Sequence, residues 1–271
     1  MRRIRTIAVL PTLFTLGNLV CGFFAIVVAA RIDAPDPALA NPSDPTNVMI
    51  SGWLIFLAMA FDALDGQLAR LSRTNSDFGV QLDSLCDLVT FGVAPGFLLV
   101  KMCPNFTYVH REAIWVIAAA FAACAALRLA RFNVETSEED NHLSFSGLPS
   151  PAAAATIASF GIMFYTLRVE HQHLDLAATA DRALQASLPY FALLMAVLMV
   201  SRIPYPHFIN QVLRGQRSFG HVVLLLFALV AVMVIRGYSV PIACCAFALG
   251  SPMRYGWEEL VLRRPHEEPL F

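Results

Sequence analysis

Residues 61–96 read FDALDGQLARLSRTNSDFGVQLDSLCDLVTFGVAPG and place four aspartates inside two stretches that are otherwise largely apolar. Asp62 and Asp65 lie near the end of the first stretch, and Asp83 and Asp87 lie near the start of the second. A charged side chain at the centre of a bilayer costs about 2.5–3.5 kcal/mol even on the lenient insertion scale. Four carboxylates in such stretches therefore need compensation.

The composition of the whole chain indicates a membrane protein. Of its 271 residues, 57% are hydrophobic and 14% are charged, whereas roughly a quarter are charged in soluble domains. This balance excludes a nucleic-acid-binding protein, a disordered chain and a disulfide-rich secreted module. The apolar runs predict an all-α polytopic bundle of about eight transmembrane helices, at 12–31, 49–71, 78–100, 112–131, 149–168, 187–201, 219–236 and 238–253.

The polar segments predict the topology. Loops are expected at 33–46 and 134–148, a membrane-embedded domain over 1–255, and a polar cytoplasmic tail over 256–271. Eight spans put both termini on one side of the membrane. Of the 19 basic residues, all fall on that side except Arg31, Lys101, Arg111, Arg168, Arg182 and Arg236. The positive-inside rule then makes that side, with the four aspartates, cytoplasmic, in the inner membrane if the host is bacterial.

The spacing of the aspartates predicts that they converge. Asp62 and Asp65 are three residues apart and Asp83 and Asp87 are four apart, so each pair lies on one helical face. Both pairs lie roughly 9–14 Å inside their helices, and an antiparallel hairpin brings the four together. Converging carboxylates repel one another unless cations lie between them, and oxygen ligands suit Mg²⁺, Mn²⁺ or Ca²⁺. Two such ions about 3.5–4 Å apart form a clamp for phosphoryl chemistry.

Small and polar residues near the aspartates each have two interpretations. Gly66, Ala69 and Gly79 either let a ligand approach closely or let membrane helices pack. Arg70 either binds a phosphate or anchors its helix at the interface, and Ser76 either faces a ligand or caps the next helix.

Two further polar groups lie elsewhere in the apolar runs. Arg128 and Arg131, three residues apart near the cytoplasmic end of the fourth span, either hold a donor phosphate or an acceptor carboxylate or are plain interfacial arginines. Asn18 in the first span either reaches a nucleotide base or a neighbouring helix, and Asn133 has the same two roles open.

Together these residues resemble the signature of the CDP-alcohol phosphotransferase family, D-x2-D-G-x2-A-R-x8-G-x3-D-x3-D. Its eight fixed positions are filled by Asp62, Asp65, Gly66, Ala69, Arg70, Gly79, Asp83 and Asp87. Other stretches resemble the membrane-embedded phosphatidylserine synthase branch, namely PTLFTLGNLVCGFFA at 11–25, RLARFN at 128–133, GLPSPAAA at 147–154 and MVSRIPYPHF at 199–208. One position departs from that branch, because His207-Phe208 stands where Ser-Phe is usual.

The resemblance implies an integral membrane enzyme that transfers the phosphatidyl group from CDP-diacylglycerol to the hydroxyl of L-serine, giving phosphatidylserine and CMP. It implies a homodimer and two divalent cations, Mg²⁺ or Mn²⁺ with Ca²⁺ possible. The metal ligands are then Asp62, Asp65, Asp83 and Asp87, and Asp87 is also the general base. Contacts to CDP-diacylglycerol are expected from Gly66, Ala69, Arg70, Ser76, Gly79 and Asn18, and contacts to the acceptor or a phosphate from Arg128, Arg131 and Asn133.

Two alternatives stay open at this point. The same chemistry could use inositol phosphate or glycerol phosphate as acceptor, because Arg128, Arg131 and Arg202 could supply a basic pocket. A cation or proton transporter could use intramembrane aspartates as an ion relay, but no polar path continues through the remaining spans.

Overall fold

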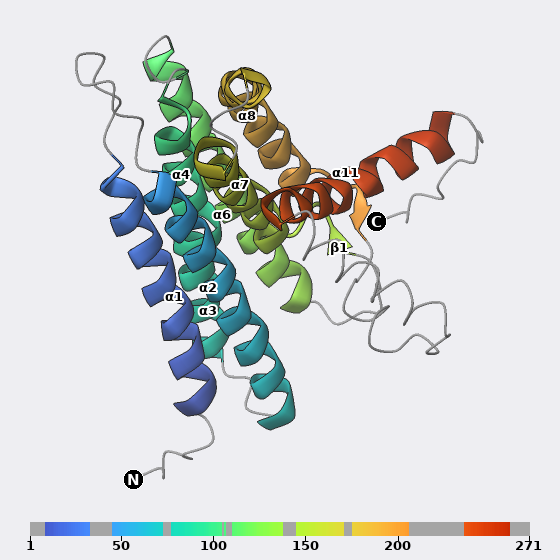
Figure 1. Ribbon diagram of the computed structural model, residues 1–271. Coiled ribbons are helices and arrows are strands. Elements are labelled where there is room, and N and C mark those ends of the chain that lie inside the picture. The colour runs from blue at the N-terminus through green and yellow to red at the C-terminus, as the bar shows by residue number, and fades with distance from the viewer. Residues whose placement is uncertain are drawn as a thin grey trace, which may run out of the picture.

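A computed structural model describes residues 9–32, 45–72, 77–104, 106, 110–137, 145–170, 175–205 and 236–260 (Figure 1). In chain order they form α1 (Val9–Ala30), α2 (Pro45–Ser72), α3 (Asp77–Asp87), the π-helical segment η2 (Leu88–Val93), α4 (Ala94–Met102), α6 (Arg111–Ser137), β1 (Phe145–Ser146), α7 (Ser150–Tyr165), the π-helical segment η3 (Thr166–Glu170), α8 (Asp175–Val200), β2 (Pro204–Tyr205), the 3-10 segment η4 (Arg236–Tyr238) and α11 (Ser239–Leu260). The two short strands pair antiparallel, Phe145 with Tyr205 and Ser146 with Pro204.

Helices long and apolar enough to cross a membrane account for most of the described chain. There are six of them within the described ranges, at Pro11–Ala30, Pro45–Leu68, Phe78–Met102, Arg111–Val134, Ser150–Val169 and Leu176–Val200. They correspond to the first six predicted spans and confirm an all-α integral membrane protein. The third crossing is built from α3, η2 and α4 in succession.

The last two predicted spans have different outcomes. The span predicted at 219–236 lies outside the described residues except for its final residue. The span predicted at 238–253 corresponds to α11, which is not among the six candidate spans. Figure 1 shows α11, in red, running across the direction of α1 and α2. The count of eight spans and the boundary at residue 255 stay predictions.

Among the first six spans, three boundaries differ from those predicted by more than three residues. Helix α2 begins at Pro45 rather than at 49, within the loop predicted at 33–46. The sixth span begins at Asp175 rather than at 187, because the charged residues Asp181 and Arg182 lower the hydropathy of a segment that is nevertheless helical. Asp181 is compensated by Arg168, whose Nε donates to it at 2.8 Å. The helix of the fourth span continues past 131 to Ser137, into a segment predicted to be a loop.

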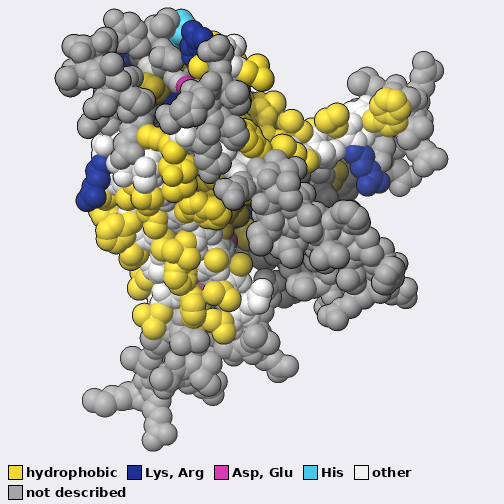
Figure 2. Space-filling view, in the orientation of Figure 1, with side chains coloured by type: hydrophobic (Ala, Val, Ile, Leu, Met, Phe, Trp, Pro, Cys, Tyr) yellow, Lys and Arg dark blue, Asp and Glu magenta, His cyan; other side chains and the backbone are white. Residues whose placement is uncertain are grey.

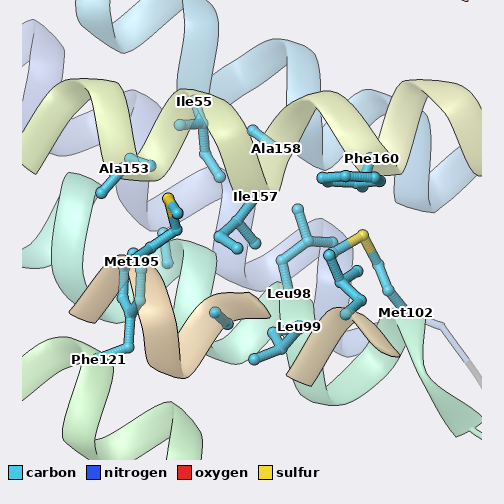
Figure 3. Close-up of a cluster of buried hydrophobic side chains, with 14 of the residues drawn as sticks. Ile55, Leu98, Leu99, Met102, Phe121, Ala153, Ile157, Ala158, Phe160 and Met195 are labelled. Carbon is cyan, nitrogen blue, oxygen red and sulfur yellow. The ribbon is translucent and has the colours of Figure 1, made fainter. Parts of the chain in front are cut away.

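Helix α7 lies at the centre of the bundle. Thirteen of its sixteen residues are buried, and Figure 3 shows Ala153, Ile157 and Ala158 among side chains from neighbouring helices. A Cβ added to Gly52 of α2 would lie 2.7 Å from the backbone oxygen of Ala158, so these two helices touch at their backbones. The central position of α7 fixes where its first residue, Ser150, lies relative to the other helices.

The outer surface of the bundle is apolar. Figure 2 shows hydrophobic side chains, in yellow, over much of the described face. Large exposed apolar residues include Phe23 and Phe24 on α1, Trp53 on α2, and Trp115 and Val116 on α6. Contiguous exposed apolar surface of this kind is typical of a lipid-facing protein.

Candidate active site

The four aspartates lie on α2 and α3, and α1 packs against both helices. One carboxylate oxygen from each of Asp62, Asp83 and Asp87 lies within 4.8 Å of the others. Asp65, one turn from Asp62, is buried with 4% of its surface exposed, and Asp87 has 7% exposed. The predicted convergence is therefore present for three of the four carboxylates as a tight group, with Asp65 close enough to act electrostatically on Asp62 and Asp83.

Several oxygens in this group have no donor. Among the described residues, Asp65 Oδ2, Asp83 Oδ1 and Asn18 Oδ1 are buried without a hydrogen-bond partner. A buried acceptor left unpaired costs about 1–3 kcal/mol, and more when it is charged. Unpaired oxygens beside carboxylates of the same sign form a ligand set for a hard divalent cation. These residues therefore fit the metal ions that the sequence predicts.

Asn18 connects α1 to Asp87. Its Nδ2 donates to Asp87 Oδ1 at 2.9 Å, and the Thr90 hydroxyl donates to the Asn18 backbone oxygen at 3.2 Å. Asn18 is fully buried. A Cβ on Gly22 would overlap the Thr90 hydroxyl and lie 2.9 Å from Thr90 Cα. The close approach of α1 to η2 holds Asn18 beside the carboxylate.

The third span changes its helical period directly after Asp87. Leu88–Val93 is π-helical, and its residues Thr90, Phe91 and Gly92 are buried. Single π-helical turns inside α-helices occur often at functional sites because they reorient the side chains around them. Here the turn begins one residue after the expected general base.

Arg128 of α6 faces the carboxylates. The charged groups that act on it most strongly are Asp87 and then Asp62. Its Nη1 donates to Ser150 Oγ at 2.7 Å, and its guanidinium lies 5.7 Å from the centre of the Phe132 ring. Arg128 is thus near enough to Asp87 and Asp62 to be affected by their charges, and it is hydrogen-bonded to the first residue of α7.

The remaining candidates divide into three sets. Asn133 and Ser84, the residue after Asp83, hydrogen-bond to each other at 2.8 and 3.3 Å. Of the two roles predicted for Asn133, the structure therefore has the contact with a neighbouring helix. Gly66 and Gly79 lie on α2 and α3, and Arg131 is half-buried on α6. The side chains of Ala69 and Arg70, and all of Ser76, lie outside the described residues. Asn18 likewise contacts a neighbouring helix, through Asp87. Its predicted contact with CDP-diacylglycerol stays a prediction.

Three neighbours of the site were not singled out from the sequence. Thr15, whose hydroxyl donates to the Pro11 backbone oxygen at 3.1 Å, also lies beside the Asp65 carboxylate. Ser84 pairs with Asn133, and Ser150 with Arg128. Thr15 and Ser150 belong to two stretches that carry the family resemblance, 11–25 and 147–154. Membership in these stretches was the sequence feature from which a place near the site could have been predicted.

Comparison with known proteins agrees with the geometry. The profile of the family described as CDP-alcohol phosphatidyltransferase matches residues 8–201. The CDP-diacylglycerol–serine O-phosphatidyltransferase of Helicobacter pylori strain 26695 is 31% identical over 199 residues, which is 73% of this chain and 72% of the relative. The enzyme of the same name from Methanocaldococcus jannaschii is 36% identical over 159 residues, 59% of this chain and 65% of the relative.

A third relative has a related name. The archaetidylserine synthase of Methanothermobacter thermautotrophicus is 31% identical over 208 residues, 76% of this chain and 72% of the relative. The family profile covers most of the chain and includes all four aspartates. The chain belongs to the CDP-alcohol phosphatidyltransferase family and is an integral membrane transferase.

Proposed function

We propose that this protein is a phosphatidylserine synthase, which transfers the phosphatidyl group from CDP-diacylglycerol to L-serine. The observation that carries the proposal is the group formed by Asp62, Asp83 and Asp87, which lies inside the family motif and has a neighbouring cation, Arg128. The names of the relatives support serine as the acceptor.

Asp87 is suited to take a proton from the acceptor. Its Oδ1 accepts from Asn18, which fixes the carboxylate and leaves Oδ2 for the substrate hydroxyl. The serine oxygen then attacks the phosphorus that carries diacylglycerol. A new P–O bond forms, the bond from that phosphorus to the CMP oxygen breaks, and CMP leaves with the bonding electrons. The products are phosphatidylserine, CMP and the proton first taken by Asp87.

The negative charge in this reaction calls for cations. Asp62, Asp65, Asp83 and Asp87 would hold two divalent ions, Mg²⁺ or Mn²⁺ in preference to Ca²⁺. When bound, these ions would offset the charge of the donor pyrophosphate and of the transferring phosphoryl group. Asp65 and Asp87 have only 4% and 7% of their surface exposed, which limits the water that would otherwise compete with serine as acceptor.

The proposal includes a topology and an assembly. Both termini and the active site face the cytoplasm, since the excess of arginine lies on that side, and the protein is a homodimer. Reporter fusions at the two termini check the first statement. Light scattering on the protein–detergent complex checks the second, and a monomer mass would contradict it.

An acceptor assay tests the function directly. The purified protein in lipid nanodiscs receives CDP-diacylglycerol and, separately, L-serine, inositol phosphate or glycerol phosphate, and both CMP and the lipid product are measured. We expect phosphatidylserine and CMP from serine, loss of both with EDTA, and recovery with Mg²⁺ or Mn²⁺. CMP release only with a phosphorylated acceptor would overturn the choice of serine. Ion flux in proteoliposomes without CMP release would indicate a transporter.

A further inference from the structure

We propose that Arg128 and Ser150 form the subsite that binds the carboxylate of the acceptor amino acid. This inference rests on the proposed function and adds to it the residues that select an amino acid over other alcohols. It joins two stretches of sequence, 128–133 and 147–154, that lie on different helices and had no common role assigned.

The contact between the two side chains is the first observation. Arg128 Nη1 donates to Ser150 Oγ at 2.7 Å, and this bond ties the cytoplasmic end of α6 to the first residue of α7. One of five guanidinium N–H groups is used in this bond. The guanidinium carbon lies 5.7 Å from the centre of the Phe132 ring, a second contact that favours this position of the side chain. Arg128 thus keeps a fixed orientation and further donors.

The Ser150 hydroxyl is the second observation. Ser150 is fully buried. Its oxygen accepts from Arg128, and within the described residues no acceptor is found for its own O–H. A buried donor without an acceptor costs free energy, which an incoming ligand oxygen would recover. The hydroxyl and the guanidinium together provide two adjacent donors, the arrangement that a carboxylate with two oxygens accepts.

The position of the pair relative to Asp87 is the third observation. Asp87 is the charged group that acts most strongly on Arg128, and Asp62 is second. In free serine the hydroxyl and the carboxylate sit on adjacent carbons of one small molecule. A serine whose hydroxyl approaches Asp87 would therefore direct its carboxylate toward the nearby cation rather than toward the other acids, which repel it.

Asn133, another residue expected to contact the acceptor, is engaged with Ser84 on α3. The pyrophosphate of the donor would be bound by divalent ions at the aspartates, which leaves Arg128 for the acceptor.

The test compares two acceptors that differ only at the carboxylate, L-serine and L-serine methyl ester. Both carry the hydroxyl and the amine, so only the first should depend on Arg128 and Ser150. We expect the wild type to prefer serine. Arg128→Gln should lower kcat/KM for serine by roughly 100-fold and Ser150→Ala by roughly tenfold. The kcat/KM for the ester and the KM for CDP-diacylglycerol should each change by less than about threefold, because the lost interaction is made only with the carboxylate of the acceptor.

Matched controls separate binding from folding. Ser159→Ala makes the same change at another fully buried serine of α7, whose hydroxyl donates to the Thr156 backbone oxygen at 2.7 Å. Arg182→Gln changes an exposed arginine on α8. Both controls should keep the wild-type ratio of serine to ester. Arg128→Lys, which keeps the charge and loses the planar fork, should give an intermediate ratio.

The outcomes distinguish this inference from the proposed function. A wild type that makes no phosphatidylserine overturns both. A wild type that makes it but does not distinguish serine from the ester overturns the subsite alone. The subsite is also overturned if Arg128→Gln and Ser150→Ala lower both acceptors equally, or if they raise the KM for CDP-diacylglycerol, which would assign Arg128 to the donor phosphate.

Discussion

Two groups of wholly or partly buried charges lie at opposite ends of the bundle, and only one of them has its charges balanced. At the end of α7, Arg168 Nε donates to Asp181 Oδ1 at 2.8 Å, and Gln185 donates to the other carboxylate oxygen at 2.7 Å. The Arg168 guanidinium also lies 4.7 Å from the centre of the Phe164 ring. Here one carboxylate is matched by one cation and one amide, and the group ties η3 to α8.

The group at the start of α7 lacks this balance. Asp62, Asp83 and Asp87 converge with Asp65 nearby, and two of the four have buried oxygens without a donor. Within the described residues, Arg128 is the cation that lies close enough to exchange electrostatic attraction with Asp62 and Asp87. The comparison teaches that burial alone does not mark a functional site. A balanced, partly buried pair holds helices together, whereas an excess of one sign requires a ligand of the other.

The largest expected effect comes from Asp87→Asn, which removes the proton acceptor and keeps the shape. Turnover should fall by roughly 1,000-fold, while CDP-diacylglycerol still binds. CMP release and donor binding on the purified variant check this. Asp181→Asn makes the same change in the balanced group and should keep the turnover of the folded protein. Normal turnover in Asp87→Asn would remove its assignment as general base.

Breaking the balanced pair should affect stability instead. Arg168→Gln leaves the partly buried Asp181 without its cation and should lower the free energy of unfolding by about 2 kcal/mol, less than for a fully buried pair. Thermal melting in nanodiscs measures the loss, and the kcat of the remaining folded protein should be unchanged. The double variant Arg168→Met/Asp181→Leu should recover much of the stability. A variant that melts normally but turns over slowly would contradict the structural role.

The contact of α1 with η2 can be disturbed without touching a charge. In Gly22→Ala the new methyl group would press on the Thr90 backbone, which should cost about 1–3 kcal/mol and displace Asn18 from Asp87. Both melting temperature and kcat should fall. Gly250→Ala is the matched control, because nothing lies within 4 Å of its added Cβ. Equal behaviour of the two variants would argue against a tight α1–η2 contact.

Neutralising one aspartate of the unbalanced group should have a smaller effect, and it should raise the stability rather than lower it. In EDTA, Asp83→Asn removes a repelling carboxylate and should raise the stability by about 1 kcal/mol. With Mg²⁺ the order should reverse, because the variant loses a metal ligand. Melting curves of both proteins with and without Mg²⁺ check this. A variant less stable than the wild type under both conditions would contradict the predicted repulsion.

A neutral buried contact gives the smallest effect. The Tyr205 hydroxyl donates to the Ala248 backbone oxygen at 2.9 Å and so links β2 to α11. Burial raises the pKa of Tyr205 to about 12, from about 10 in the unfolded chain. Its contribution is therefore full below pH 10 and is lost as the pH rises toward 12. Tyr205→Phe should lower the free energy of unfolding by about 1 kcal/mol at neutral pH. Between about pH 10 and 12 the variant should lose less stability than the wild type does.

Much of the fold and the centre of the site could be predicted from the sequence. Long apolar runs predicted the first six spans. The spacing of the four aspartates predicted their convergence, which the structure has as a tight group of Asp62, Asp83 and Asp87. These features depend on local period and composition, which a sequence carries directly.

The missing parts depend on contacts between distant residues. The early start of α8 is stabilised by Arg168, which compensates a charge that hydropathy counts as unfavourable. The partners of Asn18 and Arg128 lie 69 and 22 residues away along the chain. A polar residue in an apolar helix shows that it needs a partner, but not which partner the packing supplies.

The π-helical turn at Leu88–Val93 also affects how related chains should be aligned. An α-helix advances about 100° per residue, and a π-helical turn accommodates about one extra residue. A helical wheel drawn at constant period through the third span therefore assigns every residue after Val93 to a face wrong by about that angle. A homologue one residue shorter within 88–93 would keep both its carboxylates and the contact of Gly96 with Ala118 in place, whereas a deletion within α3 before Asp83 would rotate both carboxylates relative to the residues that precede the deletion. Single-residue gaps in this segment are thus compatible with an intact site.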